Sequence, residues 1–191
     1  MKVFKLIKCY SIFVFITTSL LLGQKQHSFF EEQPTPFRTN TVSVTRNQGI
    51  FMPELSGTIE QMALQFLGAN AKTFQMQPML DDLVLSTIKE SPGGFHVRFY
   101  QKYMGIPVWN SNTVISFNHG SKIMFFMIDY HPDVSLDDIT PSLTKENALT
   151  LAEDAISSSQ LYDDPSVELM VLPLEDYYLL GYRVMLPSMD F

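Results

Sequence analysis

Histidines, a cysteine and acidic doublets are the side chains in this 191-residue chain that could carry out chemistry. No histidine is followed by Glu, and no two have the HExxH spacing that places two zinc ligands on one helix face. One lies on the polar face of a predicted strand, and two lie in predicted loops, where solvent-exposed histidines outnumber metal ligands. We therefore expect no metal site at any of them: His27, His96, His119 and His131.

The remaining reactive side chains also lack a catalytic pattern. Cys9 is the only cysteine, and it lies in a segment that we expect to be removed. A calcium loop needs ligands that alternate around a glycine, which none of the acidic doublets shows, so we expect them to cap helices or lie in solvated loops. Neither a G-x-S-x-G motif nor a glycine-rich phosphate loop occurs. The sequence thus predicts a chain that is not itself an enzyme and holds no cofactor. The doublets are Asp81-Asp82, Asp137-Asp138 and Asp163-Asp164.

Composition favours a folded protein with a hydrophobic core. At 46% hydrophobic and 17% charged residues, the chain can bury the core of one ordinary domain or two small ones. Its formal net charge is −7, and no basic cluster occurs beyond residue 8, which argues against a nucleic-acid partner.

The N-terminus has the pattern of a secretory signal peptide. Three lysines in the first eight residues precede an apolar run over residues 12–22, and the small Gly23 comes before Gln24 at a plausible cleavage site. We expect residues 1–23 to be removed and the mature chain to reach the bacterial periplasm or the outside of the cell, with no membrane attachment. Because Leu21 stands at position −3 in place of a small residue, an uncleaved anchor is the alternative.

Regular alternation over residues 95–130 predicts the central element, an antiparallel meander. Apolar and polar residues alternate over 95–103, the signature of a half-buried strand. Further strands are expected within 80–89, at 113–117 and at 123–128, joined by turns at 91–94, 104–105 and 119–120. Pro107 lacks an N–H and is expected to end the ladder. The strand at 123–128 is apolar on both faces, so we expect it to be central or covered.

Two amphipathic helices flank this meander. Thr58 begins the first with Gln61 at capping-box spacing, and Gly68 is the expected end. Thr144 caps the second, whose alanine-rich face implies close approach to a sheet, and strands at 167–172 and 177–186 follow. The fold class is therefore α+β: a helix followed by an antiparallel β-meander, then a smaller unit of one helix and strands.

The expected organisation has five parts. A flexible leader over 24–56 follows the signal peptide, and the helix and meander fill 57–131. A linker at 132–141 rich in Asp, Pro, Ser and Thr leads to the second unit, 142–191. That unit is too small to be stable by itself, so we expect it either to pack on the first unit or to be an incomplete piece of a longer chain.

One constellation resembles a known family. From Phe99 the chain has an aromatic residue, a glutamine, a turn glycine, a hydrophobic residue, Pro-Val and an aromatic residue, and a glycine turn closes the next hairpin. This order resembles the propeptide domain of fungalysin- and thermolysin-type zinc metalloproteases, and residues 142–191 resemble the adjoining PepSY module. The resemblance implies a cystatin-like propeptide fold. The motif residues, expected to control turns and the sheet edge, are Phe99, Gln101, Gly105, Ile106, Pro107, Val108, Trp109 and Gly120.

The resemblance implies a non-catalytic pro-region that helps a secreted zinc metalloprotease to fold and inhibits it until cleavage. The partner would be the catalytic domain in cis, which would carry the zinc and the HExxH motif. The chain ends before such a domain, so we expect either a fragment or a stand-alone protein. In the alternative, it is a free-standing envelope binding or inhibitor module that acts on a protease in trans. From the net charge, the binding surface is expected to be polar or acidic.

Overall fold

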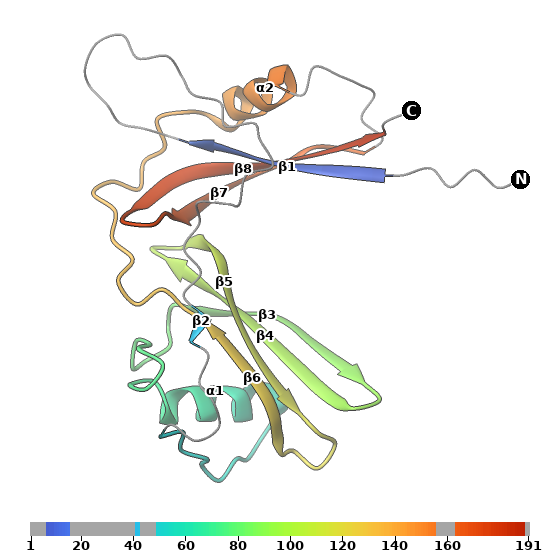
Figure 1. The fold of residues 1–191 in the computed structure, drawn as a ribbon, viewed down its shortest axis with the longest axis vertical. Coiled ribbons are helices and arrows are strands. Elements are labelled where there is room, and N and C mark those ends of the chain that lie inside the picture. Colours follow the sequence, from blue (N-terminus) through green and yellow to red (C-terminus); the bar gives the residue numbers. More distant parts are fainter. Residues whose placement is uncertain (1–6, 16–40, 43–48, 156–162, 190–191) are drawn as a thin grey trace, which may run out of the picture. The chain divides into compact units, whose positions relative to one another are not determined.

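The computed structural model describes residues 7–15, 41–42, 49–155 and 163–189. These residues contain two helices and eight strands, with the strands in consecutive runs, which confirms the predicted α+β class (Figure 1). The helices are α1 (Ile59–Ala69) and α2 (Lys145–Ala155). The strands are β1 (Ile7–Phe15), β2 (Thr41–Val42), β3 (Leu83–Ser91), β4 (Gly94–Tyr103), β5 (Ile106–Phe117), β6 (Ile123–Asp129), β7 (Ser166–Pro173) and β8 (Tyr178–Met189).

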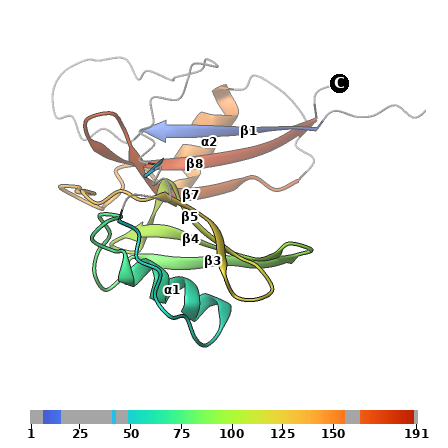
Figure 2. The same cartoon turned by 60° about the horizontal axis from the view of Figure 1, so that its bottom comes forward.

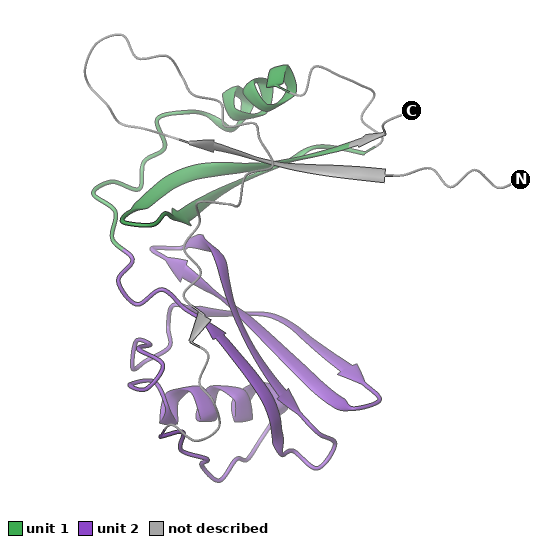
Figure 3. Ribbon diagram, in the orientation of Figure 1, with its two compact units in different colours: residues 1–37, 135–191 green, residues 38–134 purple. Residues whose placement is uncertain are grey.

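The chain divides into two compact units (Figure 3). Unit 2 comprises residues 38–134, and unit 1 comprises residues 1–37 and 135–191. The division falls inside the segment 132–141, where proline, aspartate and serine leave few apolar side chains to pack.

Unit 2 is built on the predicted antiparallel meander. Its strands pair in the order β3-β4-β5-β6, and the two residues of β2 pair with the far side of β6. The helix α1 lies against one face of this sheet (Figures 1 and 2). The core between them contains Met62, Ala63, Phe66, Leu67, Phe74, Val97, Phe99, Ile115, Phe117, Ile128 and Tyr130.

The start of α1 follows the sequence prediction, and its end does not. The Thr58 hydroxyl accepts the Gln61 N–H and the Gln61 side chain accepts the Thr58 N–H, which completes a capping box. The helix continues through Gly68 to Ala69. Asn70 ends it instead, because its side-chain amide donates to the carbonyl of Phe66 at 2.9 Å.

Residues just before α1 are less free than the predicted leader over 24–56. The Phe51 N–H donates to the Asn70 side chain at 2.7 Å, and that side chain donates back to the Phe51 carbonyl at 2.8 Å. Ile50 and Leu55 pack against the core. The expectation of a flexible leader is therefore wrong for residues 50–56, and residues 24–40 and 43–48 lie outside the described part.

The β4–β5 hairpin is longer than predicted. Met104 and Gly105 form the turn with positive φ angles of 47° and 85°. The prediction that Pro107 ends the ladder is wrong, since β5 runs through it and pairs it with Lys102. Tyr103 and Ile106 close a two-residue turn, so the next pair is a non-hydrogen-bonded one that needs no N–H from proline.

The prediction that β6 is central or covered, made from its apolar sequence, is wrong. Met124 is 60% exposed and Phe125 is 55% exposed. Only β2 pairs with β6 on the side away from β5 among the described strands, and its two partners lie at the far end, at Ile128 and Asp129. The apolar run therefore leaves large side chains in solvent.

Unit 1 contains a three-stranded antiparallel sheet in the order β1-β8-β7, with α2 on one face (Figure 1). Ala148 and Ala152 are fully buried, as expected for a helix that packs closely on strands, whereas Leu151 of the predicted apolar stripe is 37% exposed. Thr144 caps α2 as predicted by accepting the Asn147 N–H at 3.2 Å. The Tyr182 hydroxyl of β8 donates to the Leu143 carbonyl at 3.1 Å and fixes the start of the helix.

The strand β1 falls inside the segment assigned to the signal peptide. It pairs with β8 from Phe15 opposite Gly181 to Ile7 opposite Met189. The expected cleavage site at Gly23 and Gln24 lies outside the described residues. Within the described part, no helix combines the length and apolar character needed to cross a bilayer.

Candidate functional site

The motif residues that carry the family resemblance all lie in unit 2, on β4, β5 and the turns that follow them. Gly105 forms the β4–β5 turn, and Gly120 lies in the β5–β6 turn, where the Asn118 side chain accepts the Lys122 N–H at 2.9 Å. Phe99 and Val108 are 1% and 3% exposed, so they serve the core. Ile106, Pro107 and Trp109 are half-buried at the start of β5.

Gln101 is the motif residue whose role the sequence reasoning missed. It is 4% exposed, far from the turn and edge control expected of it. Its amide oxygen accepts the His131 N–H at 3.0 Å, and its amide nitrogen donates to the His131 carbonyl at 2.9 Å. The same nitrogen donates to Asp82 at 3.1 Å. Gln101 therefore ties the end of the meander to β4 and to the loop before β3.

Asp82 and Tyr130 extend this buried polar network. The Tyr130 hydroxyl donates to the Asp82 carboxylate at 2.6 Å and accepts the Gln77 N–H at 3.1 Å. Burial, then the hydrogen bond to Asp82, raises the pKa of Tyr130 well above its ordinary value of 10.0. The expectation that the Asp81-Asp82 doublet lies in a solvated loop is thus wrong for Asp82, although it is right for the exposed Asp81.

The other doublets fit the predicted loop roles in their described hydrogen bonds. Asp138 accepts the Thr140 N–H at 2.8 Å, which lowers the pKa of its carboxyl, and Asp163 accepts the Asp164 N–H at 2.9 Å. No group of three His, Cys, Asp or Glu side chains in the described ranges is arranged to hold a metal ion.

The histidines divide into three environments. His131 is fully buried, so the prediction of an exposed loop histidine is wrong there, because the Gln101 amide draws its backbone into the core. His119 is exposed as predicted, 4.0 Å from the Glu90 carboxylate. His96 projects from the polar face of β4. His27 lies outside the described residues.

His96 takes part in a serine–histidine–serine chain that the sequence reasoning also missed. Its Nε2 lies 2.9 Å from Ser91 Oγ and its Nδ1 lies 2.9 Å from Ser116 Oγ, an order that places a hydroxyl, a base and an orienting group in series. Ser91 Oγ also donates to the Gly94 carbonyl at 3.3 Å and accepts the Gly93 N–H at 3.3 Å. These contacts hold the Ser91 hydroxyl inside the β3–β4 turn. The three hydrogen-bonded side chains therefore link β3, β4 and β5.

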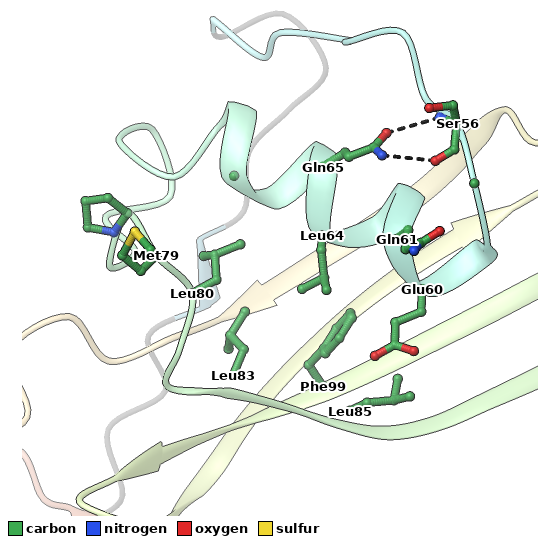
Figure 4. A pocket seen from close by; sticks show the side chains of 13 residues that line it. Ser56, Glu60, Gln61, Leu64, Gln65, Met79, Leu80, Leu83, Leu85 and Phe99 are labelled. Carbon is green, nitrogen blue, oxygen red and sulfur yellow. Dashed lines mark hydrogen bonds between the residues drawn. The ribbon is translucent and has the colours of Figure 1, made fainter.

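A groove of about 740 Å³ lies between α1 and the edge strand β3 in unit 2 (Figure 4). Its floor is apolar, with Leu83 and Leu85 from β3, Phe99 from β4 and Leu64 from α1. The exposed Met79, at 83% of its surface, stands at one end.

Polar side chains line the α1 side of the groove. Gln65 binds the backbone of Ser56 on both sides, accepting its N–H at 3.1 Å and donating to its carbonyl at 3.0 Å. Glu60 extends from the first turn of α1 toward Leu85 (Figure 4). It is the only charged residue that lines the described groove.

The strand β3 adds hydrogen-bonding capacity to this groove. Among the described strands it pairs with β4 alone, so its other edge has backbone groups without a strand partner. A bulge between Leu85 and Thr87 interrupts the ladder at mid-strand. The part of β3 beside the groove is Leu83 to Leu85, before the bulge, where the Leu83 N–H already donates to the Leu80 carbonyl at 3.1 Å. A polypeptide segment could add there as a further strand with its side chains in the groove.

Comparisons with known proteins identify no relative. No family model, no curated protein and no solved structure matches this chain.

Proposed function

We propose that the chain is a non-catalytic binding module that acts as the pro-region of a secreted zinc metalloprotease, assisting the folding of its catalytic domain and inhibiting it. The observation that carries the proposal is the position of an apolar groove beside Leu83–Leu85 of β3, an edge strand that pairs only with β4 among the described strands. These two features together are what an extended polypeptide needs for backbone hydrogen bonds and side-chain pockets.

The nature of the partner rests on the resemblance of the β4–β5 motif to metalloprotease propeptides. Two features of the structure agree with a module of that kind. The helix α1 packs on an antiparallel meander, the arrangement that the resemblance implies. The motif glutamine, Gln101, ties the end of that meander to β4, so the module can form a rigid surface before any partner is present.

The same geometry serves a module joined to its protease and one that acts in trans. The two forms differ in what the gene encodes downstream. A catalytic domain with HExxH in the same reading frame is the expected result for a pro-region. A stop codon directly after Phe191 would assign the in-trans inhibitor role instead.

The groove is tested by a charge placed at its mouth. Met79→Glu should weaken the affinity for a thermolysin-type catalytic domain about tenfold, because a carboxylate would be desolvated beside the apolar floor. The matched control is Met104→Glu, since Met104 is 69% exposed in the β4–β5 turn, away from the groove. Equal affinities for both variants and the wild-type chain, measured by calorimetry, would exclude the groove as the binding site.

A further inference from the structure

The face of the unit 2 sheet that points away from α1 collects positive charge. Val97 and Ile115 of β4 and β5 belong to the core under α1. Because successive strand residues point to opposite faces, Arg98 and Val114, which pair with each other, lie on the other side. We call this side the outer face and define it by Lys89, Arg98, Lys102, Val114, Phe125 and Met127.

The half of the outer face on β3 and β4 is cationic. Lys89 and Arg98 are exposed, and in the described part of the chain no carboxylate forms an ion pair with either. Lys102 lies with its Nζ 5.6 Å from the centre of the Tyr100 ring, two residues along the same face. One carboxylate, Asp129, occupies an outward register position in β6, but it is only 6% exposed.

The half on β5 and β6 carries the large apolar side chains of the outer face. Val114 lies opposite Met127, and Ser116 lies opposite Phe125, which is 55% exposed. Neighbouring strands are about 4.8 Å apart, so β3 and β6 lie about 14 Å apart, only slightly more than the 10–12 Å diameter of one helix. A single helical or extended segment can therefore contact both halves at once.

We propose that the outer face binds an acidic amphipathic polypeptide segment of a partner protein. Its carboxylates lie over Lys89, Arg98 and Lys102, and its apolar side chains cover Phe125 and Met127. Charge complementarity selects this occupant, since the face is cationic although the whole chain has a net charge of −7. The apolar half favours a polypeptide over a nucleic acid, whose phosphates would leave Phe125 and Met127 without apolar contacts.

This second surface goes beyond the proposed function, which uses the groove on the α1 side. It also differs from the acidic binding surface expected from the net charge. A negative total net charge does not fix the sign of one face, because the β3–β4 hairpin places its cations on the same side of the sheet.

The probe is a fluorescein-labelled helical peptide of about 18 residues with glutamates along one side and leucines along the other, long enough for a helix to form. Its binding to the full chain is followed by fluorescence anisotropy. The triple variant K89E/R98E/K102E should bind at least about tenfold more weakly than wild type. The control K72E/K122E/K145E makes the same charge change at exposed lysines elsewhere. Its affinity for the peptide should fall by less than about twofold.

A single substitution tests the apolar half without any change in charge. Phe125→Ser should lower the affinity for the leucine-containing peptide about threefold. It should leave the affinity for a peptide with serine in place of leucine unchanged. Equal losses of peptide affinity in the two triple variants would overturn the proposal. So would tighter binding of single-stranded DNA, or of vesicles of anionic lipid, than of the peptide.

Discussion

Gln101 and His131 lie 30 positions apart and are joined by two hydrogen bonds between one side-chain amide and one backbone. The His131 N–H donates to Gln101 Oε1 at 3.0 Å, and Gln101 Nε2 donates to the His131 carbonyl at 2.9 Å. Both residues are buried, at 4% and 0% exposure. The amide thus replaces a strand partner for the backbone just after β6, where no described strand pairs with it.

Replacing Gln101 should destabilise the fold strongly. Gln101→Ala leaves the N–H and carbonyl of His131 buried without partners, at a cost of about 2–4 kcal/mol in the free energy of unfolding. Chemical denaturation followed by circular dichroism measures it. Gln65→Ala is the matched control, because Gln65 makes the same pair of bonds to Ser56 at an exposed site. It should cost less than about 1 kcal/mol. A similar loss in both variants would contradict the role given to burial.

Tyr130 should make the stability fall at alkaline pH. Burial and the bond to Asp82 raise its pKa in the folded state, so the folded chain holds a proton that the unfolded chain releases near pH 10. This stabilisation is fully present below pH 10 and is lost as pH rises above it, by up to about 1.4 kcal/mol per pH unit.

Tyr130→Phe removes that part of the pH dependence. Denaturation between about pH 8 and pH 11 should show a shallower alkaline decline for this variant than for wild type. Tyr177→Phe, at a tyrosine that is 60% exposed, should leave the decline unchanged. If the curves of unfolding free energy against pH stay parallel for Tyr130→Phe and wild type above pH 10, the Tyr130 hydroxyl does not cause the alkaline decline.

The two adjacent glycines at the β3–β4 turn should respond very differently to alanine. Gly94 has a φ of +135°, and a Cβ there would overlap the carbonyl oxygen of Phe117 on β5. Gly94→Ala should therefore cost more than about 3 kcal/mol of unfolding free energy. At Gly93 the nearest atom to an added Cβ is 3.8 Å away. The free energy of unfolding of Gly93→Ala should therefore stay within about 1 kcal/mol of the wild-type value. Thermal unfolding of both variants measures this, and equal melting temperatures would refute it.

The helices and the meander could be predicted because their signals are local. The capping box at Thr58 and the alternation after Phe95 depend on neighbours in sequence, which fix side-chain direction before any tertiary contact forms. The ends of elements were less predictable. Asn70 ends α1 through its own side chain, and Pro107 stays in β5 because its missing N–H meets a non-hydrogen-bonded position.

The buried network and the groove could not be predicted in the same way, because they depend on strand register. His131 and Asp82 look like loop residues until Gln101 and Tyr130 reach them from other strands. The groove joins residues of α1 with residues of β3, and the bulge after Leu85 sets which of them face it. No local pattern records these juxtapositions, whereas the β4–β5 motif suggested a family without showing where a partner would bind.

Inhibition of a zinc metalloprotease by the chain, expressed with its export segment and purified after secretion, tests the proposed function most directly. We expect saturable, one-to-one inhibition of a fungalysin- or thermolysin-type enzyme with a Kd at or below about 1 μM, and weaker inhibition by Met79→Glu than by Met104→Glu. Full protease activity at about 100 μM of folded chain, with enzymes of both types, would contradict it.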